Sequence, residues 1–139
     1  MDAHLIRLRA WDGKRMLYRS VFDRNWYRDD DRCVQVALPK DETTLKVDQF
    51  TGLVDKNGKD IYEGDVLIDG EACSSKRGKK FVVKWFRGGF MRKYGGYFGY
   101  SSIEKYDGDI ERYCEVIGNI YQNPDLIEYE YSKEATHDA

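Results

Sequence analysis

Apolar and polar residues alternate along several short segments of the chain, which is the pattern of β-strands with one buried face. The first segment covers residues 6–11, and Asp12-Gly13 after it predicts a hairpin turn leading to a return strand at residues 16–18. Other segments predict strands at residues 33–38, 45–50, 66–68, 79–86 and 115–121. The sequence therefore predicts a mainly β protein built from short strands.

Glycines mark many of the bends between these segments, and the clearest bend is Asn57-Gly58. Both residue types tolerate a positive φ, so this pair predicts a type I′ hairpin turn. Gly52 and Gly64, on either side, are expected to adopt backbone angles that residues with a side chain rarely take.

The last predicted strand contains Gly118 and Asn119. A glycine inside an apolar strand usually marks a bulge or a close backbone approach, and Asn119 is expected to satisfy a nearby backbone group rather than a ligand. Asn123-Pro124 then suits the N-cap and first position of a helix. This predicts a short C-terminal helix from Pro124 to about Glu134.

The chain length and the charge pattern refine this picture. With 139 residues the chain suits one domain with its own core, expected at residues 1–127, followed by a polar tail at residues 128–139. The formal net charge of −2 gives no general case for binding nucleic acid or a membrane. It conceals a strongly basic segment, residues 72–103, followed by a strongly acidic one, residues 104–139.

Candidate chemistry is sparse. The three cysteines, Cys33, Cys73 and Cys114, form no CxxC pair, and residues 1–11 hold no apolar leader, so we expect reduced thiols and a cytoplasmic protein. His4 and His137 lie near the termini, and no HExxH, GxSxG or P-loop motif is present. These absences predict a protein that is not an enzyme, with no catalytic residues, metal or cofactor.

Two acidic clusters are candidate cation sites. The first consists of Asp55, Asp60, Glu63 and Asp65, but its spacing does not fit an EF-hand loop, so these carboxylates are expected to solvate or cap backbone amides. The second is Asp29-Asp30-Asp31, where alternating side-chain directions favour a solvated turn.

Three stretches of the chain resemble the YopX family of phage and prophage proteins. They are residues 9–12, residues 49–66 with the run QFTGL and the later run IYEGDV, and residues 115–124 with EVIGNIY before Asn-Pro. The resemblance covers about residues 5–127. It implies a β-rich fold with an SH3-like barrel, a phage or prophage origin and self-association, and it implies no reaction.

The resemblance defines a set of signature residues that we expect to maintain the structure: Trp11, Gly52, Asn57, Gly58, Tyr62, Gly64, Asp65, Gly118 and Asn119. For Trp11 two interpretations were compared. An exposed indole beside Arg9 could stack on a base or a peptide, but a core tryptophan with a satisfied ring N–H is favoured. The expected architecture is an N-terminal β meander, an SH3-like barrel and a short C-terminal helix.

The basic aromatic segment at residues 76–100 is the best candidate for a binding surface. Cations that track phosphates and rings that stack on bases are the combination used by single-stranded nucleic-acid binders. The residues expected to carry it are Lys84, Trp85, Arg87, Arg92 and Lys93. Alternatively, Phe81, Val83 and Trp85 are core, and the cations keep an edge soluble or contact the acidic segment.

The sequence ranks three classes of function. The first is a non-catalytic, self-associating protein-interaction module, a phage or prophage accessory protein that binds a second copy and an unidentified phage or host macromolecule. The second is a nucleic-acid-binding protein that uses residues 76–100. An enzyme is ranked last, and no membrane partner is expected.

Overall fold

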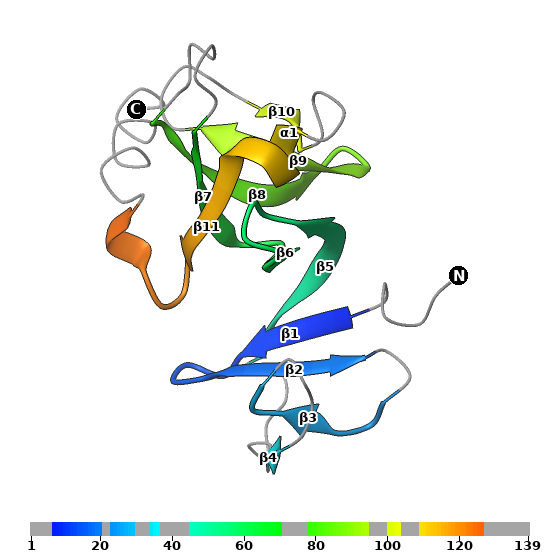
Figure 1. Ribbon diagram of the computed structural model, residues 1–139. Helices are drawn as coiled ribbons and strands as arrows, with labels where there is room; N and C mark the ends of the chain where they lie inside the picture. Colours follow the sequence, from blue (N-terminus) through cyan, green and yellow to red (C-terminus); the bar gives the residue numbers. More distant parts are fainter. Residues whose placement is uncertain are drawn as a thin grey trace. The chain divides into compact units, whose positions relative to one another are not determined.

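The computed structural model describes residues 7–20, 23–29, 34–36, 45–70, 78–94, 100–103 and 109–126 (Figure 1). These residues are mainly β, as predicted. The elements are β1 (Arg7–Trp11), β2 (Met16–Ser20), β3 (Trp26–Tyr27), β4 (Gln35–Val36), β5 (Lys46–Val54), β6 (Asp60–Tyr62), β7 (Asp65–Asp69), β8 (Lys80–Phe86), β9 (Gly89–Tyr94), β10 (Tyr100–Ser102), α1 (Asp109–Tyr113), β11 (Cys114–Asn119) and the 3-10 helix η4 (Pro124–Leu126).

The chain divides into two compact units, Met1–Thr51 and Gly52–Ala139. The boundary falls within β5, where Gly52 has a φ of 86°. The expected single domain at residues 1–127 stays a prediction, and the tail at residues 128–139 lies outside the described residues. Cys33, Cys73, both histidines, half of the acidic segment and the part of the predicted C-terminal helix beyond Leu126 also lie outside the described residues.

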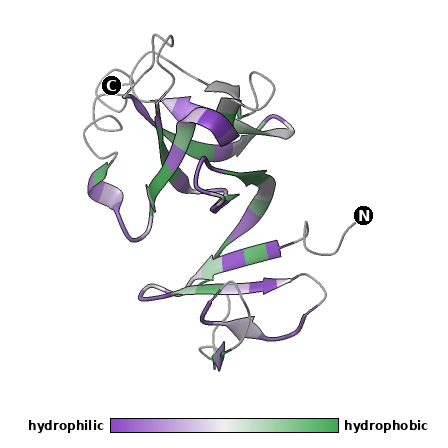
Figure 2. Ribbon diagram, viewed as in Figure 1, coloured by the Kyte–Doolittle hydropathy of each residue, from purple (hydrophilic) through white to green (hydrophobic). Residues whose placement is uncertain are grey.

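The first unit is a small antiparallel meander, as the sequence predicts. β1 pairs with β2 from Arg7↔Ser20 to Trp11↔Met16, and on its other side with β5. Figure 2 shows the alternation of hydrophilic and hydrophobic residues along β1. The predicted turn at Asp12-Gly13 is present, and Gly13 has a φ of 101°.

The carboxylate of Asp12 organises this turn. Its Oδ1 accepts hydrogen bonds from Lys14 N and Arg15 N at 2.8 Å, and its Oδ2 accepts from Arg15 Nε at 2.8 Å. Burial acts to raise the pKa of Asp12, but the hydrogen bonds and charge of Arg15 outweigh it and the pKa is lowered.

Trp11 does not belong to the core of the first unit, contrary to the expectation. The buried residues are Ala10, Leu17 and Trp26, whereas Trp11 is only half-buried. The guanidinium of Arg19 lies 5.0 Å above the ring of Trp26. Trp26 is therefore the core tryptophan, and the preferred interpretation of Trp11 was wrong, because its strand places a different residue, Ala10, at the centre of the packing.

The second unit contains a five-stranded antiparallel sheet in the order β10-β9-β8-β7-β11. The sheet is not closed, because β10 and β11 are its two edges and do not pair with each other. The structure therefore does not confirm the expected barrel closure. The sequence analysis also missed α1, a single turn whose Ile110 is fully buried before β11.

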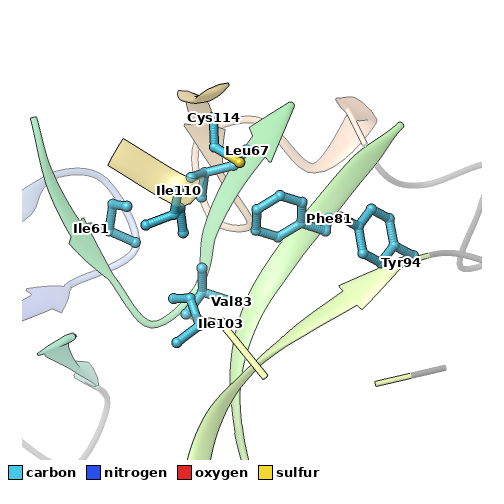
Figure 3. Packing of buried hydrophobic residues seen from close by; sticks show 8 residues of the cluster. All are labelled: Ile61, Leu67, Phe81, Val83, Tyr94, Ile103, Ile110 and Cys114. Carbon is cyan, nitrogen blue, oxygen red and sulfur yellow. The ribbon is translucent and has the colours of Figure 1, made fainter. Parts of the chain in front are cut away.

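One apolar cluster forms the core of this unit (Figure 3). Its buried residues come from strands β6 to β9, from Ile103, from α1 and from the start of β11: Ile61, Leu67, Phe81, Val83, Tyr94, Ile103, Ile110 and Cys114. Cys114 is buried, with 1% exposure. Packing of β-branched and aromatic side chains from neighbouring strands is the main stabilising contribution here.

The opposite face of the sheet is also covered. Val66 and Val82 are fully buried there, against Ile117, Ile120 and Leu126. The segment after β11 reaches this face because β11 bulges, with a register shift between Val116 and Gly118. The bulge expected at Gly118 is confirmed, and Pro124 begins η4 as predicted.

Replacing Gly118 with alanine is expected to destabilise the second unit by about 1–2 kcal/mol. A Cβ at this position would lie 2.5 Å from Asn123 Oδ1 and 2.8 Å from Leu126 Cδ1, so both must move. Asn123 Oδ1 accepts a hydrogen bond from Asn119 N at 3.2 Å, and this bond is then strained as well. Urea unfolding followed by circular dichroism measures the loss.

Gly89→Ala is the matched control for this substitution. A Cβ at Gly89 would meet only Met91 Cε, at 3.7 Å, which is ordinary contact. We expect a change within about 0.5 kcal/mol. Equal losses in the two variants would show that the close approach at Gly118 does not matter.

Candidate interaction surface on the β8–β9 hairpin

The hairpin that joins β8 to β9 is tight and strained. Phe86 pairs with Gly89, so Arg87 and Gly88 are the two loop residues. Both have positive φ, 52° for Arg87 and 84° for Gly88, which defines a type I′ turn. The turn type expected at Asn57-Gly58 therefore occurs here, with an arginine at a position that favours asparagine or glycine.

Arg87→Asn is expected to stabilise the protein by about 1 kcal/mol, because asparagine adopts positive φ at lower cost than arginine. Arg87 is exposed, so the substitution removes little packing. The measurement is the urea midpoint. Lys84→Asn, in strand β8, is the control. It should not stabilise the protein, because asparagine is disfavoured at strand positions. An unchanged or lower midpoint for Arg87→Asn would contradict the prediction.

One face of the hairpin carries an apolar row out of the core. Phe81 lies opposite Tyr94, Val83 opposite Arg92, and Trp85 opposite Phe90. The first two pairs are buried, but the side chain of Trp85 is exposed, with the residue 53% accessible. Its ring meets the ring of Phe90 edge-on, with centroids 4.9 Å apart.

Trp85 was also considered as a core residue, and the structure shows that it is not. β8 continues past the end of β7, because their pairing runs only from Val66↔Val82 to Ile68↔Lys80. Among the described residues, the last backbone–backbone hydrogen bond on that side runs from Gly64 N to Val83 O, at 2.8 Å. The row of core residues therefore ends at Val83, and Trp85 projects beyond it.

The five residues expected to form a binding surface divide into two groups. Trp85 and Arg87 are exposed and Lys84 is half-buried, and these three lie at the end of the hairpin. The guanidinium of Arg87 lies 5.2 Å from the ring centre of Phe86. Arg92 and Lys93 are buried, with 3% and 8% exposure, so they do not belong to this surface.

Arg92 instead holds the core together. Its Nε and one terminal nitrogen donate to Ile103 O at 2.9 and 2.7 Å, and the other lies 4.0 Å from Asp69 Oδ2. The guanidinium also lies 5.2 Å from the ring centre of Phe81. Arg92 therefore joins the end of the β9–β10 pair to the centre of the sheet, which the sequence pattern did not reveal.

Tyr94 shares the same carboxylate, and its hydroxyl donates to Asp69 Oδ2 at 3.2 Å. Burial raises the pKa of Tyr94 well above its usual value, against the opposing effect of Arg92. This cluster of Asp69, Arg92 and Tyr94 is thus an internal structural network.

The backbone of Trp85 has an unusual partner. Its N–H points to the side where β7 has ended, and it donates to Glu63 Oε2 at 3.4 Å. A side-chain carboxylate therefore takes the place of a neighbouring strand at this position. Charged side chains at such places are one way in which proteins protect open strand edges.

The signature loop at residues 55–59 is a separate structural site. Gly58 N donates to Asp55 O at 3.0 Å, Asp55 N donates to Lys59 O at 2.9 Å, and of the three loop residues at positions 56–58 only Gly58 has a positive φ. This geometry is a type I turn followed by a glycine bulge. The expectation of a type I′ turn was wrong, because the loop closes over three residues instead of two.

Asp55 fixes this loop to β11 through its buried carboxylate. Oδ1 accepts from Asn57 N and Lys59 N at 2.8 and 2.9 Å, and Oδ2 accepts from Val116 N at 2.9 Å. Lys56 N also donates to Cys114 O at 2.9 Å. The acidic residues near this loop were expected to cap backbone amides, and Asp55 does so. Asp55 was not among the expected signature residues.

Other signature residues make similar local contacts. Asp65 Oδ2 accepts from Tyr62 N at 2.8 Å, and Gly64 has a φ of 88°, as expected. Asn119 Oδ1 accepts from Tyr121 N and Gln122 N at 3.0 and 2.9 Å. Among the described residues, no group of three or more histidine, cysteine or acidic side chains could hold a metal ion.

Comparison with known proteins gives the following matches. The model of the YopX protein family matches residues 7–128. No curated protein matches the chain significantly. The crystal structure of protein EF1440 from Enterococcus faecalis covers 88% of this chain, and the match spans 99% of that chain, with 27% sequence identity and a TM-score of 0.56.

Proposed function

This chain belongs to the YopX family, and from that premise we propose that it is a non-catalytic, self-associating interaction module encoded by a phage or prophage and acting in the host cytoplasm. The observation that carries the proposal is Trp85, which extends the apolar row of the core into solvent at the end of the β8–β9 hairpin. Exposed tryptophan and arginine side chains are the residues most enriched at the energetic centres of protein interfaces.

Several features support a contact surface made by the hairpin end. Phe90 holds the indole of Trp85 edge-on, which limits its motion and lowers the entropy lost when a partner binds. The type I′ turn fixes the end of the hairpin.

A search of the described residues for a helix with the length and hydropathy of a membrane span finds none.

We also propose that the second unit is related to SH3-like barrels. Its five strands are arranged so that the last pairs with the first, and the other three follow in chain order, β11-β7-β8-β9-β10. A single helical turn, α1, precedes the last strand. This arrangement supports an open version of that fold, with small aromatic-lined surfaces of the kind that such domains use for peptides.

Nucleic-acid binding is the second candidate. Lys84 and Arg87 lie close to Trp85 in the sequence, and single-stranded nucleic-acid binders combine cations with exposed rings. The burial of Arg92 and Lys93 leaves fewer cations at this surface than the sequence suggested. We therefore rank this function below protein interaction.

Mass measurement by light scattering at high protein concentration tests the first proposal. We expect a species heavier than the 16.3 kDa chain. Trp85→Ala should reduce that species, whereas Val47→Ala, an exposed apolar residue of the other unit, should not. A monomer at all concentrations would overturn self-association.

Titration of single-stranded DNA at several salt concentrations tests the second candidate. Binding that falls steeply with salt, and that is lost in Lys84→Ala with Arg87→Ala, would favour it over the first. Absence of binding at low salt would remove it.

A further inference from the structure

We propose that two copies of this chain associate through the open edge of β8, which pairs antiparallel with the same edge of the second copy around a two-fold axis at Trp85. The inference rests on the self-association proposed above and specifies its surface. The two five-stranded sheets would then be joined through one pair of backbone hydrogen bonds, flanked by the aromatic side chains of the hairpin.

The backbone of β8 supplies the donor and the acceptor for this pairing. In an antiparallel hairpin, hydrogen bonds point alternately to the two sides of a strand. The residues that close the two-residue turn, Phe86 and Gly89, bond to each other, so Trp85 and Val83 point away from β9. Val83 O is taken by Gly64 N, and Trp85 is the next residue on that side.

Among the residues that the structure describes, no strand covers the edge at Trp85. Its N–H donates to Glu63 Oε2 at 3.4 Å, which is a long and exposed hydrogen bond to a side chain. A backbone carbonyl from a second strand could replace that carboxylate at little cost, because the bond is at the weak end of the accepted range. Edges of this kind are the sites at which β-strands from different chains pair.

Charge complementarity favours a second copy as the occupant. A two-fold axis at Trp85 places Val83 of one copy opposite Arg87 of the other. Glu63 lies beside Val83, because the next residue, Gly64, is bonded to Val83 O at 2.8 Å. Glu63, displaced from Trp85 N, therefore faces Arg87 of the second copy, and symmetry produces this ion pair twice.

The aromatic residues fit the same arrangement. Self-pairing brings the two Trp85 side chains to directly opposed positions on one face of the joined sheet, where each is flanked by its own Phe90. Opposed aromatic residues are among the most favourable cross-strand pairs. The pairing thus removes from water the most exposed large apolar side chain among the described residues, Trp85 at 53%.

Charge reversal at the edge tests the inference in the full chain. Glu63→Arg alone and Arg87→Glu alone should each weaken dimerisation by about tenfold or more, as close interfacial charge pairs do. The double variant, Glu63→Arg with Arg87→Glu, should recover most of the wild-type affinity. Sedimentation equilibrium measures the dissociation constants, and circular dichroism checks that each variant folds.

A second pair of variants isolates the backbone contribution. Trp85→Pro and Trp85→Ala both remove the indole, but only proline also removes the N–H that points to the open edge. Trp85→Pro should therefore weaken dimerisation further than Trp85→Ala does, with the β8–β9 hydrogen bonds left intact.

The outcomes separate this inference from the function on which it rests. If the wild-type chain is monomeric, self-association itself fails. If the wild-type chain associates but neither charge reversal nor proline changes its dissociation constant, only the β8 edge is overturned, and another surface carries the association. Recovery of affinity in the double charge variant supports the proposed pairing, because a merely damaged surface would not regain it.

Discussion

Asp55→Ala is expected to destabilise the second unit by about 3 kcal/mol or more. Asp55 is 2% exposed, and its carboxylate accepts from three backbone N–H groups, those of Asn57, Lys59 and Val116. Hydrogen bonds to a charged group each contribute about 1.5–3 kcal/mol, and alanine would leave these donors without an acceptor in a partly buried place. Urea unfolding measures the total loss.

Asp55→Asn separates the two roles of this side chain. An amide has one oxygen where the carboxylate has two, so it can keep the bonds to Asn57 N and Lys59 N or the bond to Val116 N, but not both sets. We expect an intermediate loss of stability. Hydrogen exchange should show which part of the site is lost, through faster exchange at Val116 N or at the loop amides.

Asp12→Ala is the matched control for Asp55. Asp12 also accepts from two backbone amides of a β-turn, Lys14 N and Arg15 N, but its bonds are exposed and reach no other element. A loss near 1 kcal/mol is therefore expected, as for other local caps. If Asp12→Ala and Asp55→Ala cost the same, the bond from Asp55 to β11 contributes nothing measurable.

Asn57 and Asp55 illustrate which features of the fold can be predicted from the sequence and which cannot. Local chemistry predicted a turn at Asn57-Gly58, and it predicted a bulge at Gly118, because both depend on backbone angles that few residue types adopt. The type of the first turn depends on Asp55 and on contacts with Cys114 and Val116. Those contacts join positions about sixty residues apart, and no short-range pattern encodes them.

The candidate surface was predicted only in part, again because it depends on contacts between residues that are distant in the sequence. Alternation along residues 79–86 correctly placed Phe81, Val83 and Trp85 on one face, but it could not show where the neighbouring strand ends. Arg92 and Lys93 were assigned to the surface because cations and aromatic rings alternate in this segment, as they do in single-stranded nucleic-acid binders. The burial of Arg92 depends on Asp69 and on Ile103 O, which only the folded sheet brings to it.

Helix α1 was not predicted from the sequence for a different reason. Five residues, Asp109–Tyr113, are too few to show a helical period, and their helix-forming tendency in isolation is small. Ile110 is fully buried in the core cluster, so tertiary packing stabilises this turn. Tertiary contacts also explain why Trp11 was wrongly expected in the core, since it lies in a short strand whose neighbours decide which ring is covered.

Arg92→Met is expected to destabilise the second unit by about 3–5 kcal/mol, the usual cost of removing one partner from a buried charged pair. Methionine fills much of the same space, but it leaves Ile103 O without the donors at 2.7 and 2.9 Å and removes the guanidinium 4.0 Å from Asp69. Urea unfolding, followed by circular dichroism, gives the free energy of unfolding.

Two further variants show whether the loss comes from the buried charge. Arg87→Met, an exposed cation at the end of the same hairpin, should change stability by less than about 0.5 kcal/mol. Asp69→Asn in the Arg92→Met background should cost less than the sum of the two single variants, because it neutralises a carboxylate that has lost its counter-charge. Additive effects would show that the pair does not couple.

This difference between the two arginines decides how binding experiments on the hairpin must be interpreted. If Arg92→Met unfolds the second unit, loss of any partner or of nucleic acid in that variant reports loss of structure, not loss of a contact. Arg87 is exposed and Lys84 is half-buried, so we expect their removal to leave the core unchanged. Binding that survives Arg87→Met with Lys84→Met, while the protein stays folded, would exclude an electrostatic role for the end of the hairpin.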